Sequence, residues 1–436
     1  MAPDNIRGRR PRPGELAVVV GAGRSGLAAA RLLAGRGGRV RLLEHDAAAV
    51  PAGIKARLDE LGIELVVGEH RPEHFENSAF IVPSPGIPAS RLERFVGVEK
   101  RTKRPEILAE TELAWRYLDG EPVLAVTGTS GKTTTASLAA AMLQAQGYTV
   151  FLGGNIGTPL SEYLLSGRHA DVLVLELSSF QLQTCSTFHP RVGVLLNISS
   201  NHLDYHEDMR EYVEAKFRLF RCQEEGDLAV LGAELKPLAG DFRLQARQIY
   251  VENKGRFTKC RLLGPHNKVN MEAAWQACRF FGVREDKAGA AVAGFRPLPH
   301  RLEIVRRHRS VTYINDSKCT TVAALRVALQ ALEQPVRLLC GGKFKGGNLS
   351  ELRDLVKARV VEVALFGASR EKFEEAWQGV VPVTWHEMLE PAVRLLSAHA
   401  RKGDAVLLAP ATSSFDLYAD YMARGDDFKH IVEVLP

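Results

Sequence analysis

Short hydrophobic runs recur along the chain, each followed by a glycine-rich turn and then by a stretch rich in alanine and leucine. From Leu16, the run LAVVV leads into GAGRSG, then into LAAARLLAGRGG, and then into RVRLLEHD. Apolar runs of this length predict buried strands, and the alanine-rich stretch predicts a helix. The first part of the chain is therefore predicted to contain a βαβ unit.

The same order returns at Val123, where VLAVT leads into GTSGKTTT and then into ASLAAAMLQAQG. We predict a strand, a turn and a helix that stops at Gly147. The basic segment KRTKRPE lies between the two patterns and indicates a domain boundary. Beyond Pro299, the runs VRLLC, VVEVALF and AVLLAP alternate with helical stretches. That alternation predicts a further α/β domain whose strands are mostly parallel.

Length and composition set the class of protein. A chain of 436 residues exceeds one hydrophobic core of ordinary size, so we expect three domains. The content of 45% hydrophobic and 25% charged residues is typical of a folded globular protein. No apolar run approaches the ~20 residues that span a bilayer. The N-terminal segment MAPDNIRGRRPRPGE lacks the apolar stretch of a signal peptide. We therefore predict a cytoplasmic protein with no membrane partner.

The net charge and the cysteines limit the classes of partner and cofactor that we expect. The formal net charge of +6 is spread along the chain, and its one basic cluster lacks interleaved aromatic residues. The members of that cluster are Lys100, Arg101, Lys103 and Arg104. We expect no nucleic-acid partner and interpret the excess charge as pockets for nucleotide phosphates. The six cysteines form no C-x-x-C pair, which argues against a zinc site and against a disulfide framework. Most of them are predicted to be small buried apolar residues.

The segment from Gly128 to Thr134 lies where a predicted strand ends and a predicted helix begins. Backbone N–H groups and the helix dipole at such a junction can hold phosphate groups. Lys132 would reach the β- and γ-phosphates, and the hydroxyl of Thr133 would bind magnesium. The segment departs from the strict G-x-x-x-x-G-K-[ST] pattern, because Val126 stands at the first glycine position. We predict an ATP-binding loop, and the alternative is a glycine-rich turn with an exposed lysine.

Polar residues also follow two later hydrophobic runs. Glu176 closes the run DVLVLE, and His202 and Asp204 follow the run VGVLLN. The carboxyl ends of parallel strands meet at one edge of the sheet, where ligands bind. Because a magnesium nucleotide needs hard oxygen ligands, we predict that Glu176 and His202 act in metal binding. His206 is interpreted as a surface or packing residue.

The glycines after the first predicted strand allow two interpretations. Gly21, Gly23 and Gly26 form G-x-G-x-x-G, and Glu44 follows 18 residues after the last of them. This pattern is typical of dinucleotide binding, so a nicotinamide dehydrogenase is one alternative. A dehydrogenase has no use for the ATP loop, and no second βαβαβ half is evident before that loop. The same turn can hold the pyrophosphate of a uridine diphosphate sugar, with SPGI from Ser84 as a further wall. We favour the sugar nucleotide.

Ten segments, in order through nearly the whole chain, resemble the Mur ligase family, which extends the peptidoglycan stem peptide one residue at a time. They are GAGRSG, SPGIP, TGTSGKTTT, GGNIG, ELSSFQL, NISSNHLDYH, GPHNKVN, PHRLE, INDSKCTT and LAPATSSFDLYADYMARGDDF. The last segment is similar to the C-terminal signature of the glutamate-adding members. The D-N-P-R-type motif of the members that add meso-diaminopimelate does not occur in the sequence.

The resemblance implies an α/β fold with three domains. Residues 1–108 would form a Rossmann-like domain that binds the UDP-sugar. Residues 109–297 would form a central P-loop ATPase-type domain that binds ATP. Residues 298–436 would form a C-terminal Rossmann-like α/β domain that binds the amino acid.

Site residues are implied position by position. The positions that match ATP-binding residues are Gly128, Thr129, Ser130, Gly131, Lys132, Thr133, Thr134, Asn267, Asn270, Arg301 and Asp316. Those that match the UDP-sugar site are Gly23, Arg24, Ser25, Glu44, His45, Ser84, Gly86, Asn155, Ser178 and Gln181. Those that match the amino-acid pocket are Lys318, Thr320, Lys345, Ser414, Phe415 and Tyr421. The implied catalytic residues are Lys132, His202, Lys216 and Lys318. The implied metal ligands are Thr133, Glu176, His202 and Lys216 in a carbamylated form.

Some positions depart from the family pattern. The family commonly has an acid directly before the histidine of the third strand-end motif, and this chain has Asn201. The lysine loop GGKFKGG holds both Lys343 and Lys345, and the sequence leaves open which of them reaches the substrate. Glu44 replaces a usual aspartate at the end of the second strand, which leaves the contact with uracil open.

The activity that the resemblance implies is ATP-dependent addition of D-glutamate to UDP-N-acetylmuramoyl-L-alanine through an acyl phosphate. It also implies two magnesium ions, small-molecule substrates and a monomer. L-glutamate stays open as the amino acid, because its charges suit the same pocket. Two alternative functions remain. One is a P-loop ATPase that acts as a switch, and the other is a folylpolyglutamate synthase. The latter shares the central loop and the glutamate pocket but has no need for residues 1–108.

Overall fold

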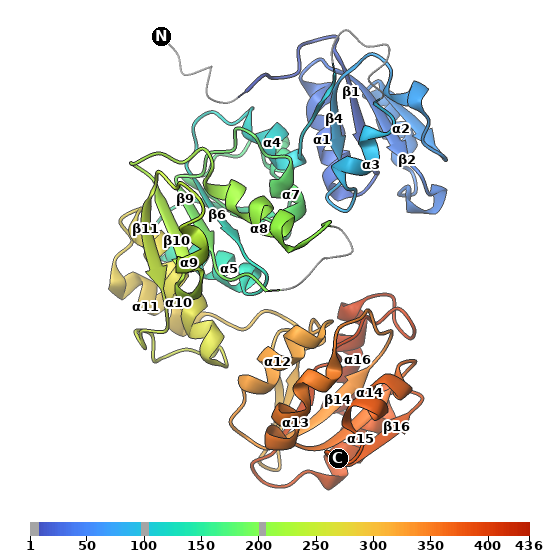
Figure 1. Cartoon of the computed structure of the whole chain (residues 1–436), viewed down its shortest axis with the longest axis vertical. Helices are drawn as coiled ribbons and strands as arrows, with labels where there is room; N and C mark the ends of the chain where they lie inside the picture. Colours follow the sequence, from blue (N-terminus) through green and yellow to red (C-terminus); the bar gives the residue numbers. More distant parts are fainter. Residues whose placement is uncertain (1–7, 97–103, 200–205) are drawn as a thin grey trace. The chain divides into compact units, whose positions relative to one another are not determined.

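The computed structural model describes residues 8–96, 104–199 and 206–436. It divides into two compact units. The first comprises Met1–Arg256 with Val269–Val292, and the second comprises Phe257–Lys268 with Ala293–Pro436. The first unit contains two β-sheets and the second contains one (Figure 1).

The first sheet is parallel and has the strand order β3-β2-β1-β4-β5. Its strands are β1 (Leu16–Val20), β2 (Arg39–Glu44), β3 (Ile63–Val67), β4 (Ser78–Pro83) and β5 (Glu106–Ile107). The helices of this part are α1 (Arg24–Gly35), α2 (Ile54–Glu60) and α3 (Ala89–Glu93). Alternate residues of β1 enter two different apolar cores, because successive side chains of a strand point to opposite faces. The predicted βαβ unit is confirmed.

The second sheet is also parallel, with the order β11-β10-β9-β6-β8-β7. Its strands are β6 (Val123–Thr127), β7 (Val150–Gly154), β8 (Val172–Glu176), β9 (Val192–Leu195), β10 (Leu228–Gly232) and β11 (Arg247–Val251). Its helices are α4 (Glu110–Trp115), α5 (Lys132–Gln146), α6 (Leu160–Ser166), α7 (Ser179–Gln183), α8 (Met209–Phe217), α9 (Lys236–Ala239), α10 (Pro265–Arg279) and α11 (Glu285–Gly294). Helix α5 ends at Gly147, as predicted, with φ of +109°.

The third sheet has the order β12-β13-β17-β14-β15-β16. Its strands are β12 (Glu303–His308), β13 (Val311–Asn315), β14 (Val336–Gly341), β15 (Val360–Phe366), β16 (Val383–His386) and β17 (Ala405–Leu408). Its helices are α12 (Val322–Gln330), α13 (Arg353–Arg359), α14 (Arg370–Trp377), α15 (Leu389–His399) and α16 (Tyr421–Glu433). Strand β12 is antiparallel to β13 and the other pairs are parallel, so the prediction of mostly parallel strands is confirmed.

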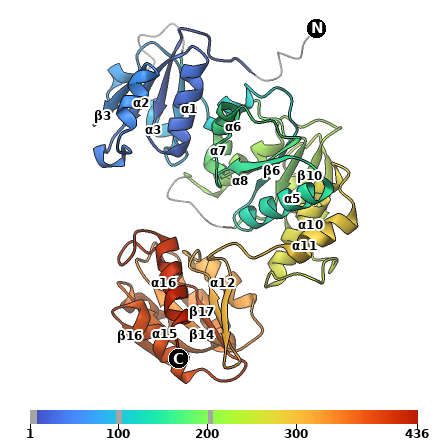
Figure 2. The ribbon, with the colours of Figure 1, turned by 180° about the vertical axis from the view of Figure 1, so that it is seen from behind.

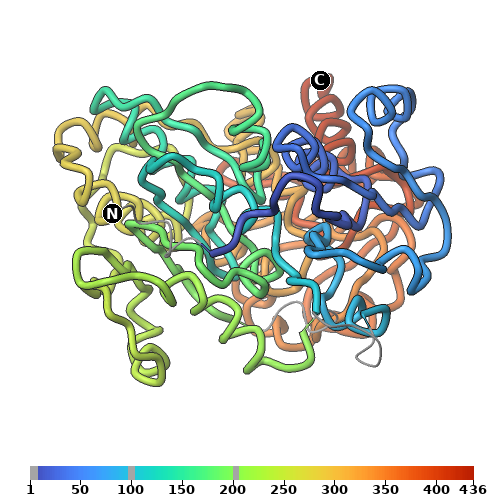
Figure 3. Tube along the Cα trace, turned by 90° about the horizontal axis from the view of Figure 1, so that it is seen from above, coloured from blue at the N-terminus to red at the C-terminus, as the bar shows by residue number. Residues whose placement is uncertain are grey.

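The third sheet has an apolar core on each face. One core includes buried residues of α12, α13 and α14, and the other includes residues of α15 and α16. Figure 2 shows β17 beside β14, with α15 and α16 next to them. The chain ends after α16, which is drawn in red in Figure 3. Helices on both faces of a mostly parallel sheet define a doubly wound α/β fold.

Short 3₁₀ helices complete the described elements. They cover Ala47–Ala49, Pro72–Phe75, Arg218–Phe220, Ala233–Leu235 and Leu349–Leu352. The α/β fold class is therefore confirmed for all three sheets. The domain boundaries after residues 108 and 297 stay a prediction.

Candidate functional site

The predicted phosphate loop lies between the end of β6 at Thr127 and the start of α5 at Lys132. Gly128 has φ of +151° and Gly131 has φ of +84°, a region in which residues with side chains are strained. A Cβ atom on Gly131 would also lie 2.5 Å from Oδ1 of Asn270. The first N–H groups of a helix have no acceptor within the helix, so this turn can bind phosphate.

Two lysines approach the same carbonyl oxygen of this loop. Nζ of Lys132 donates hydrogen bonds to the carbonyls of Gly128 and Thr129, each at 3.0 Å. Nζ of Lys216, from α8, donates to the carbonyl of Gly128 at 2.9 Å. Lys216 is buried, and this burial, together with the charge of Lys132, lowers its pKa well below the usual value. Burial therefore disfavours the charged form of Lys216 beside the loop.

Two residues that the sequence did not indicate also fix the loop. Asn197 follows β9, and its Oδ1 accepts a hydrogen bond from the N–H of Ser130 at 2.9 Å. Tyr212 of α8 places its hydroxyl 2.9 Å from Oγ1 of Thr129. The Tyr212 ring also lies 4.6 Å from Nζ of Lys216. These contacts join α8 and the end of β9 to the phosphate loop.

Glu176 is buried at the end of β8, as the sequence predicted. Its Oε1 accepts a hydrogen bond from Nδ2 of Asn155 at 2.8 Å, and its carbonyl accepts one from the N–H of Asn155 at 2.8 Å. A Cβ atom on Gly154 would lie 2.4 Å from that carbonyl, so the close approach requires glycine. Among the described residues, Oε2 of Glu176 has no hydrogen-bond partner.

The predicted metal ligands are only partly described. His202 lies outside the described residues, and so do Asn201 and Asp204. In the described part of the chain, no group of three or more histidine, cysteine, aspartate or glutamate side chains lies close enough together to hold a metal ion. The unpartnered Oε2 of Glu176 nevertheless fits a hard cation, because a buried carboxylate oxygen needs a positive or hydrogen-bonding partner.

The two predicted adenine-side residues are both buried on α10. Asn270 lies beside Gly131, within the first unit. Asn267 belongs to the second unit, where its Nδ2 donates to the carbonyl of Leu263 at 2.7 Å.

The glycine turn after β1 is closely packed. A Cβ atom on Gly26 would lie 1.9 Å from the carbonyl oxygen of Gly21, and one on Gly21 would lie 2.5 Å from Oγ of Ser84. Oγ of Ser84 donates to the carbonyl of Gly21 at 3.2 Å. The SPGI segment therefore lies directly against the glycine turn, as the sequence predicted for the two walls of one site.

Glu44 holds this turn with both carboxylate oxygens. Its Oε2 accepts a hydrogen bond from the N–H of Ala22 at 2.7 Å, and its Oε1 accepts one from the N–H of Asp46 at 3.1 Å. The guanidinium of Arg24 donates to the carbonyl of Gly157 in the loop that follows β7. Gly23, Arg24, His45 and Gly86 are exposed in this region, and Ser25 is half-buried.

An aromatic cluster at the ends of β2 and β3 was not predicted. The rings of His45 and His70 lie 6.0 Å apart at their centroids, and His70 lies 6.5 Å from both Phe75 and Phe95. The rings of Phe75 and Phe95 are stacked 5.1 Å apart. Burial, then the neighbouring His45, lowers the pKa of His70. This cluster lines the sheet edge beside His45 with aromatic rings.

Ser178 and Gln181 lie at the start of α7, directly after β8. Oγ of Ser178 accepts from the N–H of Gln181 at 3.3 Å, and Oε1 of Gln181 accepts from the N–H of Ser178 at 3.0 Å. Nε2 of Gln181 donates to Oγ1 of Thr111 on α4 at 3.4 Å. His206 is buried, with Nε2 2.9 Å from Oγ of Ser179. It therefore packs inside the first unit and is not a surface residue.

The SPGI segment and α7 form the two sides of a cleft within the first unit. The polar or large residues of its wall are Ser84, Ile87, Glu110, Phe180, Gln181 and Thr184. The structure thus brings together Ser84 and Gln181, which the sequence placed in one sugar-nucleotide site.

In the second unit, Asp316 follows β13 and is the next predicted nucleotide contact. Its Oδ1 accepts a hydrogen bond from the N–H of Leu302 at 3.2 Å. Burial raises the pKa of Asp316 from 3.8 to about 7, although the Leu302 N–H and the charge of Arg301 oppose this rise. A carboxyl group in this state can exchange a proton near neutral pH.

The residues predicted to bind the amino acid lie after β13, β14 and β17 and at the start of α16. Nζ of Lys318 lies 3.8 Å from the ring centroid of Tyr421, and Nζ of Lys345 lies 5.7 Å from that of Phe415. Phe415 is 66% exposed, which is unusual for so large an apolar side chain.

Other members of the pocket are fixed by their backbone. Ser414 is buried, and its carbonyl accepts hydrogen bonds from the N–H groups of Leu417 and Tyr418. Thr320 is half-buried. The backbone of Lys343 pairs with that of Ser413, and its side chain is exposed.

Three family models match the chain in order. They are the MurD-like N-terminal domain of Mur ligases at residues 15–95, the Mur ligase middle domain at 126–250, and the glutamate ligase domain of Mur ligases at 300–412. Each range overlaps one of the three sheets, and together the ranges cover most of the chain. The chain belongs to the Mur ligase family.

Two relatives match along the full length. The UDP-N-acetylmuramoylalanine--D-glutamate ligase of Desulfovibrio desulfuricans is 67% identical over 434 residues, which are 99% of this chain and 99% of that protein. The ligase of the same name from Nitratidesulfovibrio vulgaris is 59% identical over 435 residues, which are 100% of both. The resemblance to Mur ligases is thereby confirmed.

A solved structure supports the fold. The crystal structure of MurF ligase from Thermotoga maritima in complex with ADP superposes with a TM-score of 0.61, at 16% sequence identity, over 99% of each chain. This likeness shows a shared three-domain α/β fold. Within the described residues, no helix combines the length and the apolar character needed to cross a membrane.

Proposed function

We propose that this chain is an ATP-dependent ligase that joins D-glutamate to UDP-N-acetylmuramoyl-L-alanine in peptidoglycan precursor synthesis. The observation that carries this proposal is the identity of 67% with a ligase of that name across nearly the whole chain. Each of the three sheets overlaps a matching family domain, which supports separate parts for the sugar nucleotide, ATP and the amino acid.

The proposed division of labour follows the three sheets. Residues 1–108 bind the UDP-sugar, residues 109–297 bind ATP, and residues 298–436 bind the amino acid. ATP is held by the loop between β6 and α5, with Asn267, Asn270, Arg301 and Asp316 as further contacts. The buried positions of both asparagines and the glycine turn at Gly131 support this assignment.

Magnesium ions would be held by Thr133, Glu176, His202 and a carbamylated Lys216. The buried, unpartnered Oε2 of Glu176 and the lowered pKa of Lys216 support this set. When bound, the ions would supply positive charge that stabilises the transferring phosphoryl group.

The sugar nucleotide is proposed to bind between the glycine turn, SPGI and α7. Gly23, Arg24 and Ser25 would face the pyrophosphate at the start of α1, where helix N–H groups favour anions. Ser84 and Gly86 would form the second wall. Glu44 and His45 lie toward the base, and Asn155, Ser178 and Gln181 lie toward the alanyl end.

D-glutamate is proposed to bind in the second unit. The ammonium groups of Lys318 and Lys345 would pair with its carboxylates, and Thr320 and Ser414 would donate hydrogen bonds. Phe415 and Tyr421 would cover the aliphatic part of the substrate. The cation–π contacts of both lysines hold their ammonium groups beside these rings.

The reaction can then be written as two displacements. A carboxylate oxygen of the alanyl group attacks the γ-phosphorus of ATP, the bond to the ADP oxygen breaks, and an acyl phosphate forms. The amine of D-glutamate attacks the acyl carbon and loses a proton, and phosphate leaves as the amide forms. Lys132 would place its ammonium group at the transferring phosphoryl group, where it neutralises negative charge.

The remaining partners follow from these substrates. All three substrates are small molecules, and we propose that the enzyme acts as a monomer. ATP and a nucleotide-linked sugar are both expected in the cytoplasm, which is the proposed location. We propose no nucleic-acid or membrane partner.

The test is phosphate release with ATP, magnesium and UDP-N-acetylmuramoyl-L-alanine, in parallel reactions with D-glutamate, L-glutamate, L-alanine or meso-diaminopimelate. Release should depend on D-glutamate and fall by roughly 10²- to 10³-fold in Lys132→Ala. Lys287→Ala, which changes an exposed lysine of α11 in the same unit, should behave like the parent. Release with L-glutamate alone would overturn the stereochemical assignment. Phosphate release that does not depend on the amino acid would indicate a switch-type ATPase.

A further inference from the structure

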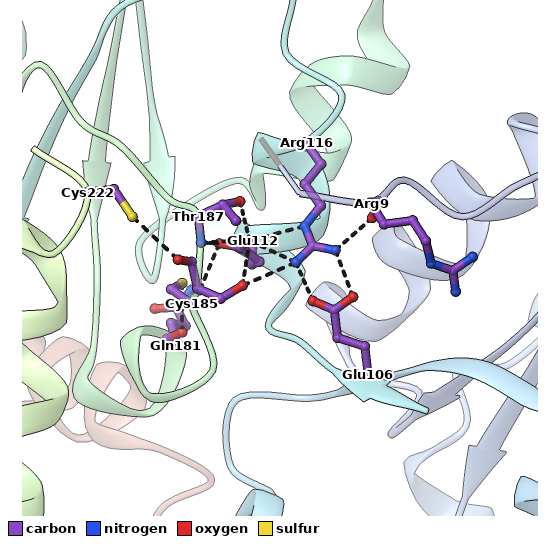
Figure 4. Close-up of polar contacts among 9 residues, drawn as sticks. Arg9, Glu106, Glu112, Arg116, Gln181, Cys185, Thr187 and Cys222 are labelled. Carbon is purple, nitrogen blue, oxygen red and sulfur yellow. Dashed lines mark hydrogen bonds and ion pairs between the residues drawn. The ribbon is translucent and has the colours of Figure 1, made fainter. Parts of the chain in front are cut away.

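Two polar contacts of different kinds join the elements around the first sheet to those around the second within the first unit. One is centred on Arg116, which is buried and pairs with Glu106 of β5 and with Glu112 of α4 (Figure 4). The other is the hydrogen bond that the guanidinium of Arg24 donates to the carbonyl of Gly157. Arg116 is enclosed by the fold, whereas Arg24 is exposed, so only Arg24 lies where a ligand can reach it.

Arg24 begins α1, directly after the glycine turn that follows β1. Arg31 lies seven residues further along the same helix, which is about two helical turns, so both arginines project from nearly the same face. The guanidinium of Arg31 pairs with Glu162 of α6 at 2.7 Å. Helix α1 therefore contacts α6 itself through Arg31, and the turn that precedes α6 through Arg24.

The turn at residues 155–157, which follows β7, is held on two sides. On one side, Asn155 donates from its N–H to the carbonyl of Glu176 and from its Nδ2 to Oε1 of Glu176, each at 2.8 Å. On the other side, the carbonyl of Gly157 accepts the hydrogen bond from Arg24. Gly157 has φ of +62°, and fixing a glycine costs more backbone entropy than fixing any other residue. The conformation of this turn therefore depends on both contacts.

The guanidinium of Arg24 also has donors to spare. A guanidinium carries several N–H groups in a planar fork, and within the described residues a single nitrogen of this one donates to the protein, at Gly157. The remaining N–H groups suit a phosphate group, which can accept two of them side by side. The backbone N–H groups at the start of α1 favour an anion at the same place.

We propose that Arg24 is a positioning residue that couples the sugar-nucleotide site to the magnesium and ATP site. Its guanidinium donates to the pyrophosphate of the sugar nucleotide and to the carbonyl of Gly157 at the same time. The turn that carries Asn155 is thereby fixed against Glu176, whose Oε2 is the proposed magnesium ligand. The inference rests on the proposed function for the places of the two ligands.

The experiment measures the affinity of the whole chain for UDP-N-acetylmuramoyl-L-alanine by calorimetry, with and without magnesium and a non-hydrolysable ATP analogue. Coupling between two binding sites is reciprocal, so the analogue should lower the dissociation constant of the sugar nucleotide in the parent by about 5- to 10-fold. Arg24→Ala should bind the sugar nucleotide more weakly in both conditions, and the ratio of the two dissociation constants should fall to about one.

Arg24→Lys separates the two contacts of the guanidinium. Lysine keeps the positive charge, so the affinity for the sugar nucleotide without the analogue should stay close to that of the parent. The ratio of the two dissociation constants should nevertheless fall toward one, because an ammonium group lacks the planar fork that serves two acceptors at once. A purely structural role of Arg24 would lower the melting temperature and leave this ratio unchanged.

Arg31→Ala is the matched control, because it removes a contact between α1 and α6 at a position without a predicted ligand. It should keep the ratio of the parent. The inference alone would be overturned by a parent that binds the sugar nucleotide without coupling, by Arg24→Ala with the ratio of the parent, or by an equal loss of coupling in Arg31→Ala. A parent that does not bind the sugar nucleotide would overturn the proposed function and this inference together. A parent that shows the coupling but forms no amide would overturn the proposed function alone.

Discussion

The phosphate loop places two lysine amines, those of Lys132 and Lys216, beside one carbonyl oxygen, that of Gly128. Lys216 is buried, with its pKa lowered well below the usual value. A neutral amine can add carbon dioxide to form a carbamate with loss of one proton. The product is a carboxylate-like group, which is the kind of ligand that magnesium prefers.

The corresponding prediction is that Lys216 carries a carbamate. In the presence of isotopically labelled bicarbonate, the carbon NMR spectrum of the protein should show a carbamate resonance that is absent in Lys216→Arg. The ligase rate of that variant should fall by roughly 10²- to 10³-fold. Lys287→Ala should keep the resonance. A resonance that persists in Lys216→Arg would assign the carbamate to another amine.

A second prediction concerns Asp316, whose pKa is raised from 3.8 to about 7 in the folded state. The folded state holds this proton at pH values where the unfolded state has lost it. The stability of the second unit should therefore fall as the pH rises from about 4 to about 7, and then level off. The expected loss is roughly 1–3 kcal/mol, reduced from the full shift because the side chain is not completely enclosed.

Asp316→Asn should remove this pH dependence, since asparagine stays neutral and its Oδ1 can still accept from Leu302. Native-state hydrogen exchange of the amides in β13 and β14 would measure the effect. Asp354→Asn, which changes an exposed carboxylate of α13, is the control and should behave like the parent. An Asp316→Asn profile that still declines between acid and neutral pH would contradict the assignment.

Among individual residues, the sequence predicted those that lie directly at strand ends or in the glycine-rich turns. Glu176 and Lys132 were predicted because their positions follow from the order of strand, turn and helix. Tyr212 and Asn197 were not predicted, since each acts through a contact with a segment distant in the sequence. A buried tyrosine on a short helix gives no sequence signal that separates it from ordinary core packing. The roles of the individual site residues stay predictions.

Among the elements, α4 is held in place by a buried ion pair between Glu112 and Arg116. Glu112 and Arg116 are both almost completely buried, and Arg116 also pairs with Glu106 at 2.5 Å and donates to the carbonyl of Arg9 at 2.7 Å. Removing one partner of a buried pair leaves the other charge in a medium that solvates it poorly. This network holds α4 against the loop after α7 and against the N-terminal segment.

We expect Glu112→Gln to lower the free energy of unfolding of the first unit by about 3 kcal/mol. Denaturant unfolding followed by tryptophan fluorescence would report it, because Trp115 is buried on α4 itself. Glu106→Gln is the matched control, since its side chain is 39% exposed and water can replace part of the interaction. The account of α4 would be wrong if Glu106→Gln cost as much as Glu112→Gln.

The sequence predicted the longer elements well. The apolar runs LAVVV and VLAVT became β1 and β6 at the predicted residues, because their continuous burial in parallel sheets leaves an unbroken apolar pattern. Helix α5 ended where Gly147 was predicted to end it. Helix α4 was not predicted, as its six residues are too few to show a helical period.

For the whole molecule, family membership decides among the alternatives that the glycine turns left open. The match of residues 15–95 to the MurD-like N-terminal domain argues against a dehydrogenase and against a folylpolyglutamate synthase, since neither needs that domain. Both oxygens of Glu44 already accept backbone hydrogen bonds, so this acid supports the turn in addition to any contact with a ligand. Only an activity measurement can exclude the alternative of a switch-type ATPase.

The central claim is that the alanyl carboxylate is activated as an acyl phosphate before the amine of D-glutamate attacks it. The most direct measurement uses UDP-N-acetylmuramoyl-L-alanine whose carboxylate carries a heavy isotope of oxygen, together with ATP, magnesium and D-glutamate. Mass spectrometry of the released phosphate then shows where that oxygen goes. The account predicts labelled phosphate in step with amide formation, because the attacking oxygen leaves with the phosphoryl group. Unlabelled phosphate accompanying the amide would contradict it.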